Sequence, residues 1–157
     1  MILMGIVATL FMDFFALHLA ELKITRQLIR PEAVGRWILY MFRGKFIHED
    51  INKAPAMKLE KTMTFLSHYV IGIVLAGVYL FLELKVPVIR HLWWMSLMFG
   101  IATVLLPWLW LYPGLGLGFL VSKAHRKSPY ITTSLINHTN FGIGMVIWIV
   151  VFRRFII

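Results

Sequence analysis

Residues 64–82 read TFLSHYVIGIVLAGVYLFL, a run of nineteen residues with no Asp, Glu, Lys or Arg. A helix of this length is about 28 Å long, close to the roughly 30 Å hydrocarbon core of a bilayer. Three further stretches are long and apolar enough to do the same, at about 2–20, 92–112 and 132–152. The sequence therefore predicts an all-α, polytopic membrane four-helix bundle forming a single transmembrane domain.

The composition agrees with this class. The 157 residues are 60% hydrophobic and their mean hydropathy is +0.80, well above what a soluble domain needs. The absence of cysteine excludes disulfides, thiolate chemistry and cysteine-ligated metals. No basic residue precedes the first apolar run and no small-residue cleavage pattern follows it. We therefore expect this run to be a span rather than a cleaved signal peptide.

The basic residues predict the topology. The formal net charge is +9, and nine of the 16 Lys and Arg residues lie between Lys23 and Lys61. Three more lie together in the connection before the last span, at Lys123, Arg126 and Lys127. Connections rich in Lys and Arg stay in the cytoplasm, so residues 23–61 are expected inside and both termini on the periplasmic side. The charge then reflects topology and attraction to anionic headgroups, not nucleic-acid binding.

Two stretches of the sequence resemble each other. LSHYVIGI begins at Leu66 and INHTNFGI begins at Ile136. Aligning them, and the spans before them, pairs His68 with His138, Gly72 with Gly142, Gly5 with Gly100 and Thr9 with Thr103. This pattern predicts two tandem-duplicated helical hairpins, related by a pseudo-two-fold axis along the membrane normal.

Ionisable residues within the spans define the candidate site. A carboxylate at the centre of a membrane helix costs roughly 2.5–3.5 kcal/mol, so such residues usually face the protein interior and have a role. Counted from the ends of their spans, Asp13, His68 and His138 lie at similar depth, about 10–13 Å inside the cytoplasmic face. Two imidazoles and one carboxylate could hold a metal with open positions. A proton relay, a ligand contact and a triad that only satisfies its own polarity remain alternatives.

Two further groups of residues belong to the candidate site. Asn137, Asn140 and Thr9 are secondary members, expected mainly to make hydrogen bonds or close contacts between helices. Arg36, Arg43 and His48 are expected to contact anionic headgroups or the charged head of a ligand.

Two connections carry additional signals. The segment after Pro31 has apolar residues at helical spacing (Val34, Ile38, Leu39 and Phe42) among basic residues, which fits a helix lying on the inner interface. A basic loop that only sets topology is the alternative. In PWLWLYPGLGLG, Pro107 must kink or end the third span. The glycines from Gly114 to Gly118 match no phosphate-binding fingerprint, but they could line a ligand pocket at the cytoplasmic mouth.

Several motifs together resemble a known family. GIVATLFMD, VGRW, RGKFIHEDINKAPA, LSHYVIGI, PWLWLYPGLGLG and NHTNFGIG occur in the order and spacing of a bacterial membrane family catalogued as domain of unknown function 2938. The resemblance covers nearly the whole chain. It implies a bacterial inner-membrane protein with four helices, and it implies no catalytic residues. Glu49 follows His48 where the family pattern has a proline, which leaves Glu49 and Asp50 without an implied role.

Three classes of function follow from these residues. The first is a buried Asp/His site near the cytoplasmic leaflet that binds a metal or a small amphiphile. The second is a redox module in which His68 and His138 ligate a b-type haem. The third is a small transporter or assembly subunit, acting as a homodimer because four helices enclose little volume. Whether the protein is an enzyme is not determined by the sequence.

Overall fold

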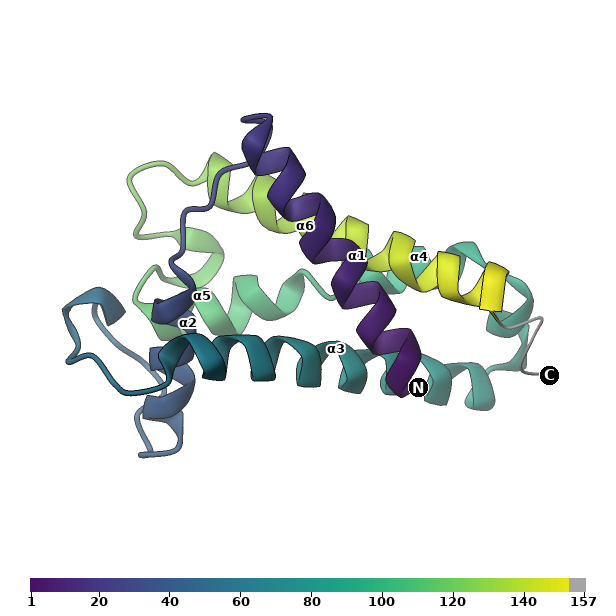
Figure 1. Cartoon of the computed structure of the whole chain (residues 1–157), viewed down its shortest axis with the longest axis horizontal. Coiled ribbons are helices and arrows are strands. Elements are labelled where there is room, and N and C mark those ends of the chain that lie inside the picture. Colours follow the sequence, from purple (N-terminus) through teal and green to yellow (C-terminus); the bar gives the residue numbers. More distant parts are fainter. Residues whose placement is uncertain (153–157) are drawn as a thin grey trace. The chain divides into compact units, whose positions relative to one another are not determined.

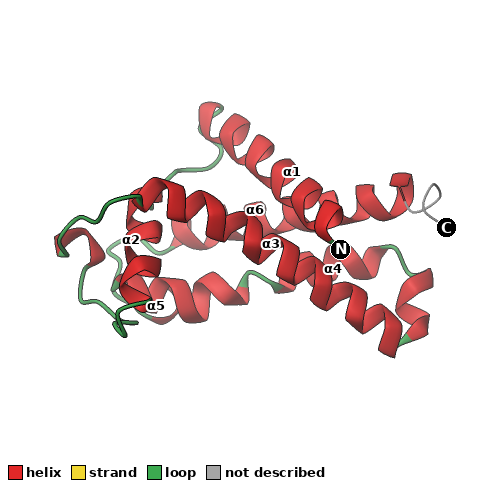
Figure 2. Cartoon of the chain, turned by 60° about the horizontal axis from the view of Figure 1, so that its bottom comes forward, coloured by secondary structure: helices red, strands yellow, loops and turns green. Residues whose placement is uncertain are grey.

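The structure, a computed structural model, describes residues 1–152, and within that range it consists of helices and loops without a strand (Figures 1 and 2). Four helical segments are long and apolar enough to cross a membrane: Ile2–Glu21, Glu60–Lys85, Trp94–Leu115 and Ser128–Phe152. They correspond to the four predicted spans, so the all-helical fold with four helices long and apolar enough to span a membrane is confirmed. The second segment begins before the predicted start at residue 64 because Glu60 and Lys61 join its first turn.

The elements follow one another in a simple order. They are α1 (Ile2–Glu21), α2 (Pro31–Met41), η1 (Ile51–Lys53), α3 (Glu60–Lys85), η2 (Pro87–His91), α4 (Trp94–Ala102), η3 (Pro107–Leu111), α5 (Tyr112–Leu115), η4 (Phe119–Val121), α6 (Ser128–Ile147) and η5 (Trp148–Phe152).

The third span is interrupted, as the proline predicted. α4 ends at Ala102, a turn follows at Thr103 and Val104, and the chain continues as a π-helical turn from Pro107. Proline has no N–H to donate to the carbonyl four residues earlier, and its ring crowds that carbonyl. Because the carbonyl in question belongs to Thr103, the break lies one turn before the proline itself.

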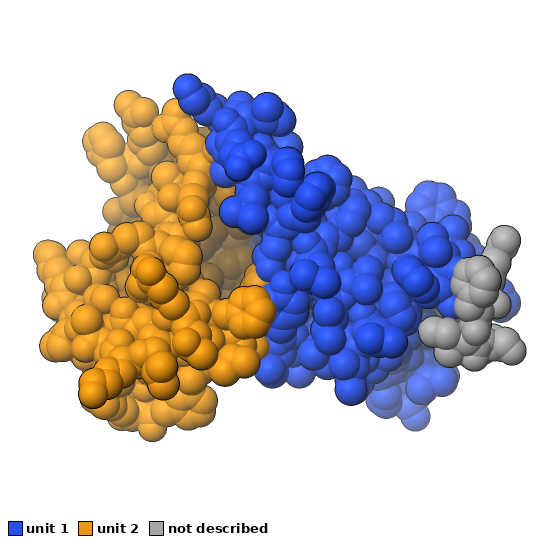
Figure 3. Space-filling view, in the orientation of Figure 1, with its two compact units in different colours: residues 1–24, 69–104, 135–157 blue, residues 25–68, 105–134 orange. Residues whose placement is uncertain are grey.

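The chain divides into two compact units (Figure 3). The first contains Met1–Ile24, Tyr69–Val104 and Leu135–Ile157, and the second contains Thr25–His68 and Leu105–Ser134. One boundary passes within α3, between His68 and Tyr69.

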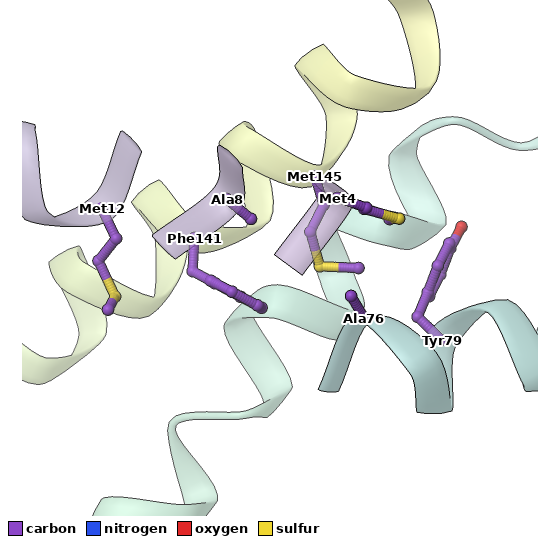
Figure 4. Close-up of a cluster of buried hydrophobic side chains, with 7 residues drawn as sticks. All are labelled: Met4, Ala8, Met12, Ala76, Tyr79, Phe141 and Met145. Carbon is purple, nitrogen blue, oxygen red and sulfur yellow. The ribbon is translucent and has the colours of Figure 1, made fainter. Parts of the chain in front are cut away.

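The core of the first unit is formed by α1, α6 and the part of α3 after residue 69. Its buried side chains are Met4, Ala8, Met12, Ala76, Tyr79, Phe141 and Met145 (Figure 4). Along this cluster Met4 lies beside Met145, whereas Met12 and Phe141 lie toward its other end (Figure 4). α1 and α6 are therefore antiparallel where they pack.

Two helix pairs in the first unit approach each other at glycines. A Cβ atom on Gly5 of α1 would collide with the backbone of Ile73 and the carbonyl oxygen of Gly72 on α3. A Cβ atom on Gly100 of α4 would likewise collide with the backbone of Gly142 on α6. Small residues let helix backbones come close in a membrane, where packing drives helix association.

The second unit has its own small core, formed by Ala33, Trp37 and Ile38 of α2 with Ile51 and Leu115. The buried face of α2 is therefore directed into the protein. Of the stripe that the sequence predicted on the inner interface, Ile38 is buried in this core, whereas Val34, Leu39 and Phe42 are not buried.

The glycines of the Gly114–Gly118 loop serve close packing within the second unit. A Cβ atom on Gly114 would collide with the indole of Trp37. Gly116 has a φ of +94°, and a Cβ atom there would collide with the carbonyl group of Glu49. Backbone and indole therefore fill the space beside these two glycines.

Candidate membrane-embedded polar site

Asp13 lies on α1 and accepts a hydrogen bond from α3. The hydroxyl group of Tyr69 donates to Oδ2 of Asp13 over 3.2 Å, and both residues are half-buried. A carboxylate within a membrane span needs a polar partner because lipid offers none. Tyr69 supplies one such partner from within the same unit.

His138 lies on α6 and contacts the interrupted end of α4. The Oγ1 atom of Thr103 is 2.5 Å from the carbonyl oxygen of Gly100 and 2.7 Å from Nδ1 of His138. The carbonyl can only accept, so the single hydroxyl proton of Thr103 belongs on the Gly100 side. Nδ1 of His138 must then carry the ring proton and donate to Thr103. In the neutral imidazole this leaves Nε2 as the nitrogen with a lone pair.

Among the described residues of α1 and α6, three buried polar atoms have no hydrogen-bond partner. They are Oγ1 of Thr9, Oδ1 of Asn137 and Nδ2 of Asn140. Thr9 is 1% exposed and Asn140 is 9% exposed, so water in the surroundings does not reach them. These three residues are the secondary members that the sequence assigned to the site.

The packing of α1 on α6 sets the depth of these groups. A Cβ atom on Gly144 would lie 2.7 Å from Cα of Ala8, which marks where the two helices meet. Asp13 lies five residues beyond Ala8, and His138 lies six residues before Gly144. At 1.5 Å per residue these offsets are about 7.5 and 9 Å along two antiparallel helices. Asp13 and His138 therefore lie at similar depth, and we call Thr9, Asp13, Asn137, His138 and Asn140 the embedded polar site.

The third residue of the predicted triad, His68, belongs to the second unit. Among the described residues, no group of three or more His, Cys, Asp or Glu side chains has an arrangement that could hold a metal ion. A metal held by Asp13, His68 and His138 stays a prediction from the sequence.

Arg36, expected to contact headgroups, forms an ion pair inside the second unit. Its guanidinium contacts Glu60 with Nε–Oε1 and NH2–Oε2 distances of 2.6 and 3.1 Å. It also donates to the carbonyl oxygens of Ile51 and Ala54. The hydrogen bond with Glu60 raises the pKa of Arg36. These contacts give Arg36 a structural role, whereas Arg43 is exposed.

His48, the other expected contact, is also buried. It is 5% exposed, and its ring packs edge-on against Tyr40 with 5.0 Å between centroids. Nδ1 donates to the carbonyl oxygen of Gly114 over 3.3 Å, and Nε2 is buried with no hydrogen-bond partner in the part of the chain that the structure describes. Burial lowers the pKa of His48, the hydrogen bond to Gly114 opposes this, and the nearby charge of Lys45 adds to the lowering.

Sequence reasoning missed two residues of this region. Tyr69 directly follows His68, and its hydroxyl could have been noticed as a polar group in an apolar run. Thr103 was not included in the candidate site, although it is paired with Thr9 in the repeat and precedes Pro107 by one turn. The position of this hydroxyl next to a helix break is the sequence feature that could have identified Thr103 as a hydrogen-bonding residue.

Comparison with known proteins identifies a family. Residues 2–152 match the family described as protein of unknown function DUF2938. The chain belongs to the DUF2938 family. No curated protein and no solved structure matches this DUF2938 chain. The family resemblance noted from the sequence motifs is thereby confirmed over nearly the full length.

Proposed function

We propose that this DUF2938 protein binds a small polar ligand within the membrane, at the embedded polar site. The observation that carries the proposal is the set of buried polar atoms without partners on α1 and α6. They lie on the same two helices as Asp13 and His138, two ionisable groups at similar depth.

Burying these atoms without hydrogen-bond partners costs free energy. A buried polar atom without a partner costs about 1–3 kcal/mol, so three of them cost about 3–9 kcal/mol. This is comparable with a typical net stability of roughly 5–15 kcal/mol. A bound ligand that supplies the missing hydrogen bonds would recover this cost, which is a reason for a chain to retain such atoms.

The unpartnered atoms also define the chemistry of the ligand. Oδ1 of Asn137 requires a donor, and Nδ2 of Asn140 requires an acceptor. The carboxylate of Asp13 favours a cationic or donor group nearby. The ligand therefore carries both donors and acceptors and places its most positive group toward Asp13.

A metal ion is the second candidate. The observation in its favour is the tautomer of His138, because the contact with Thr103 fixes Nδ1 as the donor, and a metal would therefore be bound through Nε2. Asp13 and His138 would provide two protein ligands of a type suited to a divalent transition metal.

The two glycine contacts support the proposed internal repeat. The contact of Gly5 with α3 and the contact of Gly100 with α6 involve positions that the sequence alignment pairs with each other. We infer that two copies of one helical hairpin form the protein, in the manner of parallel-repeat membrane proteins. The family resemblance suggests a bacterial inner-membrane location, and the distribution of basic residues favours both termini outside.

The test is to purify the protein from membranes in mild detergent and identify what it retains. Native mass spectrometry would detect a bound small molecule, elemental analysis a metal, and visible absorbance a haem. We expect wild type to retain a ligand that Asp13→Asn and His138→Ala lose. His18→Ala is the matched control, because His18 is an exposed histidine on α1. Retention by Asp13→Asn and His138→Ala equal to that of wild type would refute the site.

A further inference from the structure

The turn after α2 exposes an alternation of apolar and basic side chains. Its sequence, FRGKFI, covers residues 42–47. Phe42, Phe46 and Ile47 are 79%, 53% and 70% exposed, and Arg43 and Lys45 between them are exposed as well. Exposing three large apolar side chains to water is unfavourable. We therefore expect this surface to be covered by a binding partner. We call it the 42–47 turn.

The start of the turn has a defined backbone conformation, so a lack of structure does not explain the exposure of these side chains. Gly44 has a φ of +78°, the N–H of Lys45 donates to the carbonyl of Tyr40 over 3.0 Å, and the N–H of Gly44 donates to Met41 over 2.9 Å. This pair of hydrogen bonds around a left-handed glycine is a Schellman motif. The ammonium group of Lys45 also lies 5.9 Å from the centroid of the Tyr40 ring.

The end of the turn is fixed as well. The indole N–H of Trp37 donates to the carbonyl of Phe46 over 2.8 Å. The N–H of His48 then donates to the carbonyl of Gly114 over 3.1 Å. Because the backbone is fixed at both ends, the exposed side chains are presented by a defined scaffold.

We propose that the 42–47 turn inserts into the interface of a bilayer containing anionic phospholipid. The turn belongs to the connection between two membrane-crossing helices, so it remains near a membrane surface. The apolar side chains can insert at the boundary of the acyl chains, and the basic side chains between them can contact the phosphate groups. The turn carries two positive charges and no acidic residue, which is the complement of an anionic headgroup layer.

This assignment differs from an interfacial role for α2 itself. The buried face of α2 packs into the core of the second unit, and Arg36 is held by Glu60. Those groups are not available to lipid. The apolar and basic side chains that we propose to contact lipid therefore lie in the turn after α2 and not on the buried face of the helix.

Spin labelling tests the proposal directly, because the cysteine-free chain accepts single cysteines without background. A nitroxide at Phe46→Cys is compared with one at Lys58→Cys, an exposed position in the same connection. The protein is reconstituted in phosphatidylcholine with and without phosphatidylglycerol. Accessibility of each label to oxygen, which concentrates in lipid, and to a water-soluble nickel chelate is then measured by electron paramagnetic resonance.

We expect the label at position 46 to be accessible to oxygen and shielded from the nickel chelate, and the label at position 58 to show the opposite. Adding phosphatidylglycerol should increase the depth of the label at position 46 in the bilayer. Arg43→Glu with Lys45→Glu should remove that lipid dependence and weaken the preference for phosphatidylglycerol by up to about fivefold for each charge removed. Lys53→Glu with Lys58→Glu, which changes the net charge equally, should have a smaller effect.

Two results would overturn the proposal. Access of the nickel chelate to position 46 equal to that at position 58 would place the turn in water. Shielding of position 46 from both reagents would show that protein, from a second copy or another partner, covers the turn.

Discussion

Replacing Asn140 by leucine tests whether the embedded polar site is a ligand site or only imperfect packing. Leucine has nearly the same shape as asparagine and has no polar atom to satisfy. Nδ2 of Asn140 is buried without a partner, so its removal takes away a cost and breaks no hydrogen bond of that atom. Thr9→Val is the corresponding change on α1, because Oγ1 of Thr9 is also unpartnered.

The magnitude follows from the cost of an unpartnered buried atom. Each substitution should raise the free energy of unfolding of the ligand-free protein by about 1–3 kcal/mol. For a chain of this size about 1 kcal/mol shifts the midpoint of thermal unfolding by ~2–4 °C, so each variant should melt several degrees higher. Ser134→Ala is the control of opposite sign, because the buried hydroxyl of Ser134 accepts from Trp108 and donates to Ile131.

The assay is thermal unfolding in detergent, followed by tryptophan fluorescence. In ligand-free protein, Asn140→Leu and Thr9→Val should stabilise, and Ser134→Ala should destabilise. If the protein retains its ligand, the first two variants should lose both the ligand and the stabilisation it provides, so their order relative to wild type reverses. Destabilisation of ligand-free Asn140→Leu and Thr9→Val as large as that of Ser134→Ala would refute the reasoning.

Three further outcomes are expected. Arg36→Met should destabilise the protein by about 3–5 kcal/mol because it leaves Glu60 as a buried charge, and adding Glu60→Leu should recover most of the loss in thermal unfolding; equal melting of the single and double variants would contradict this. The lowered pKa of His48 means that the unfolded chain binds its proton more readily. Stability should therefore fall as pH decreases below about 6.5, and a pH series of melting temperatures should show a shallower fall for His48→Gln than for wild type. An impermeant thiol reagent added outside intact cells should label a cysteine at Val88 and not one at Lys45, and the reverse pattern would invert the topology.

Hydropathy predicted the spans because bilayer thickness fixes their length independently of tertiary detail. Apolar runs of about twenty residues have few alternatives to a membrane helix, and all four appear where expected. The break in span three was also predictable, because Pro107 lacks a backbone N–H whatever its surroundings. The break can be placed at Thr103 from the sequence alone, because a helical N–H donates to the carbonyl four residues earlier.

The side-chain partners were less predictable because they depend on contacts distant in sequence. Arg36 could be assigned to lipid as long as Glu60, 24 residues later, was not known to face it. The burial of α2 was missed for a similar reason, since Trp37 packs against Gly114 and Leu115 from another part of the chain. Thr9, Asn137 and Asn140 could be named as candidates from the sequence because a polar residue in a membrane span is visible without the fold.

The glycine contacts between helices have a consequence for how sequences of this family diverge. At Gly5 and Gly100 even a methyl group would meet the backbone of the facing helix. No change on the facing helix can make room, because the obstacle is main chain and not a side chain. Mutation at either position is therefore rejected without a compensating partner, although neither glycine has a group that could bind or react. In an alignment of homologues these two columns would be as invariant as those of a binding residue, so invariance alone would not separate the scaffold from the site.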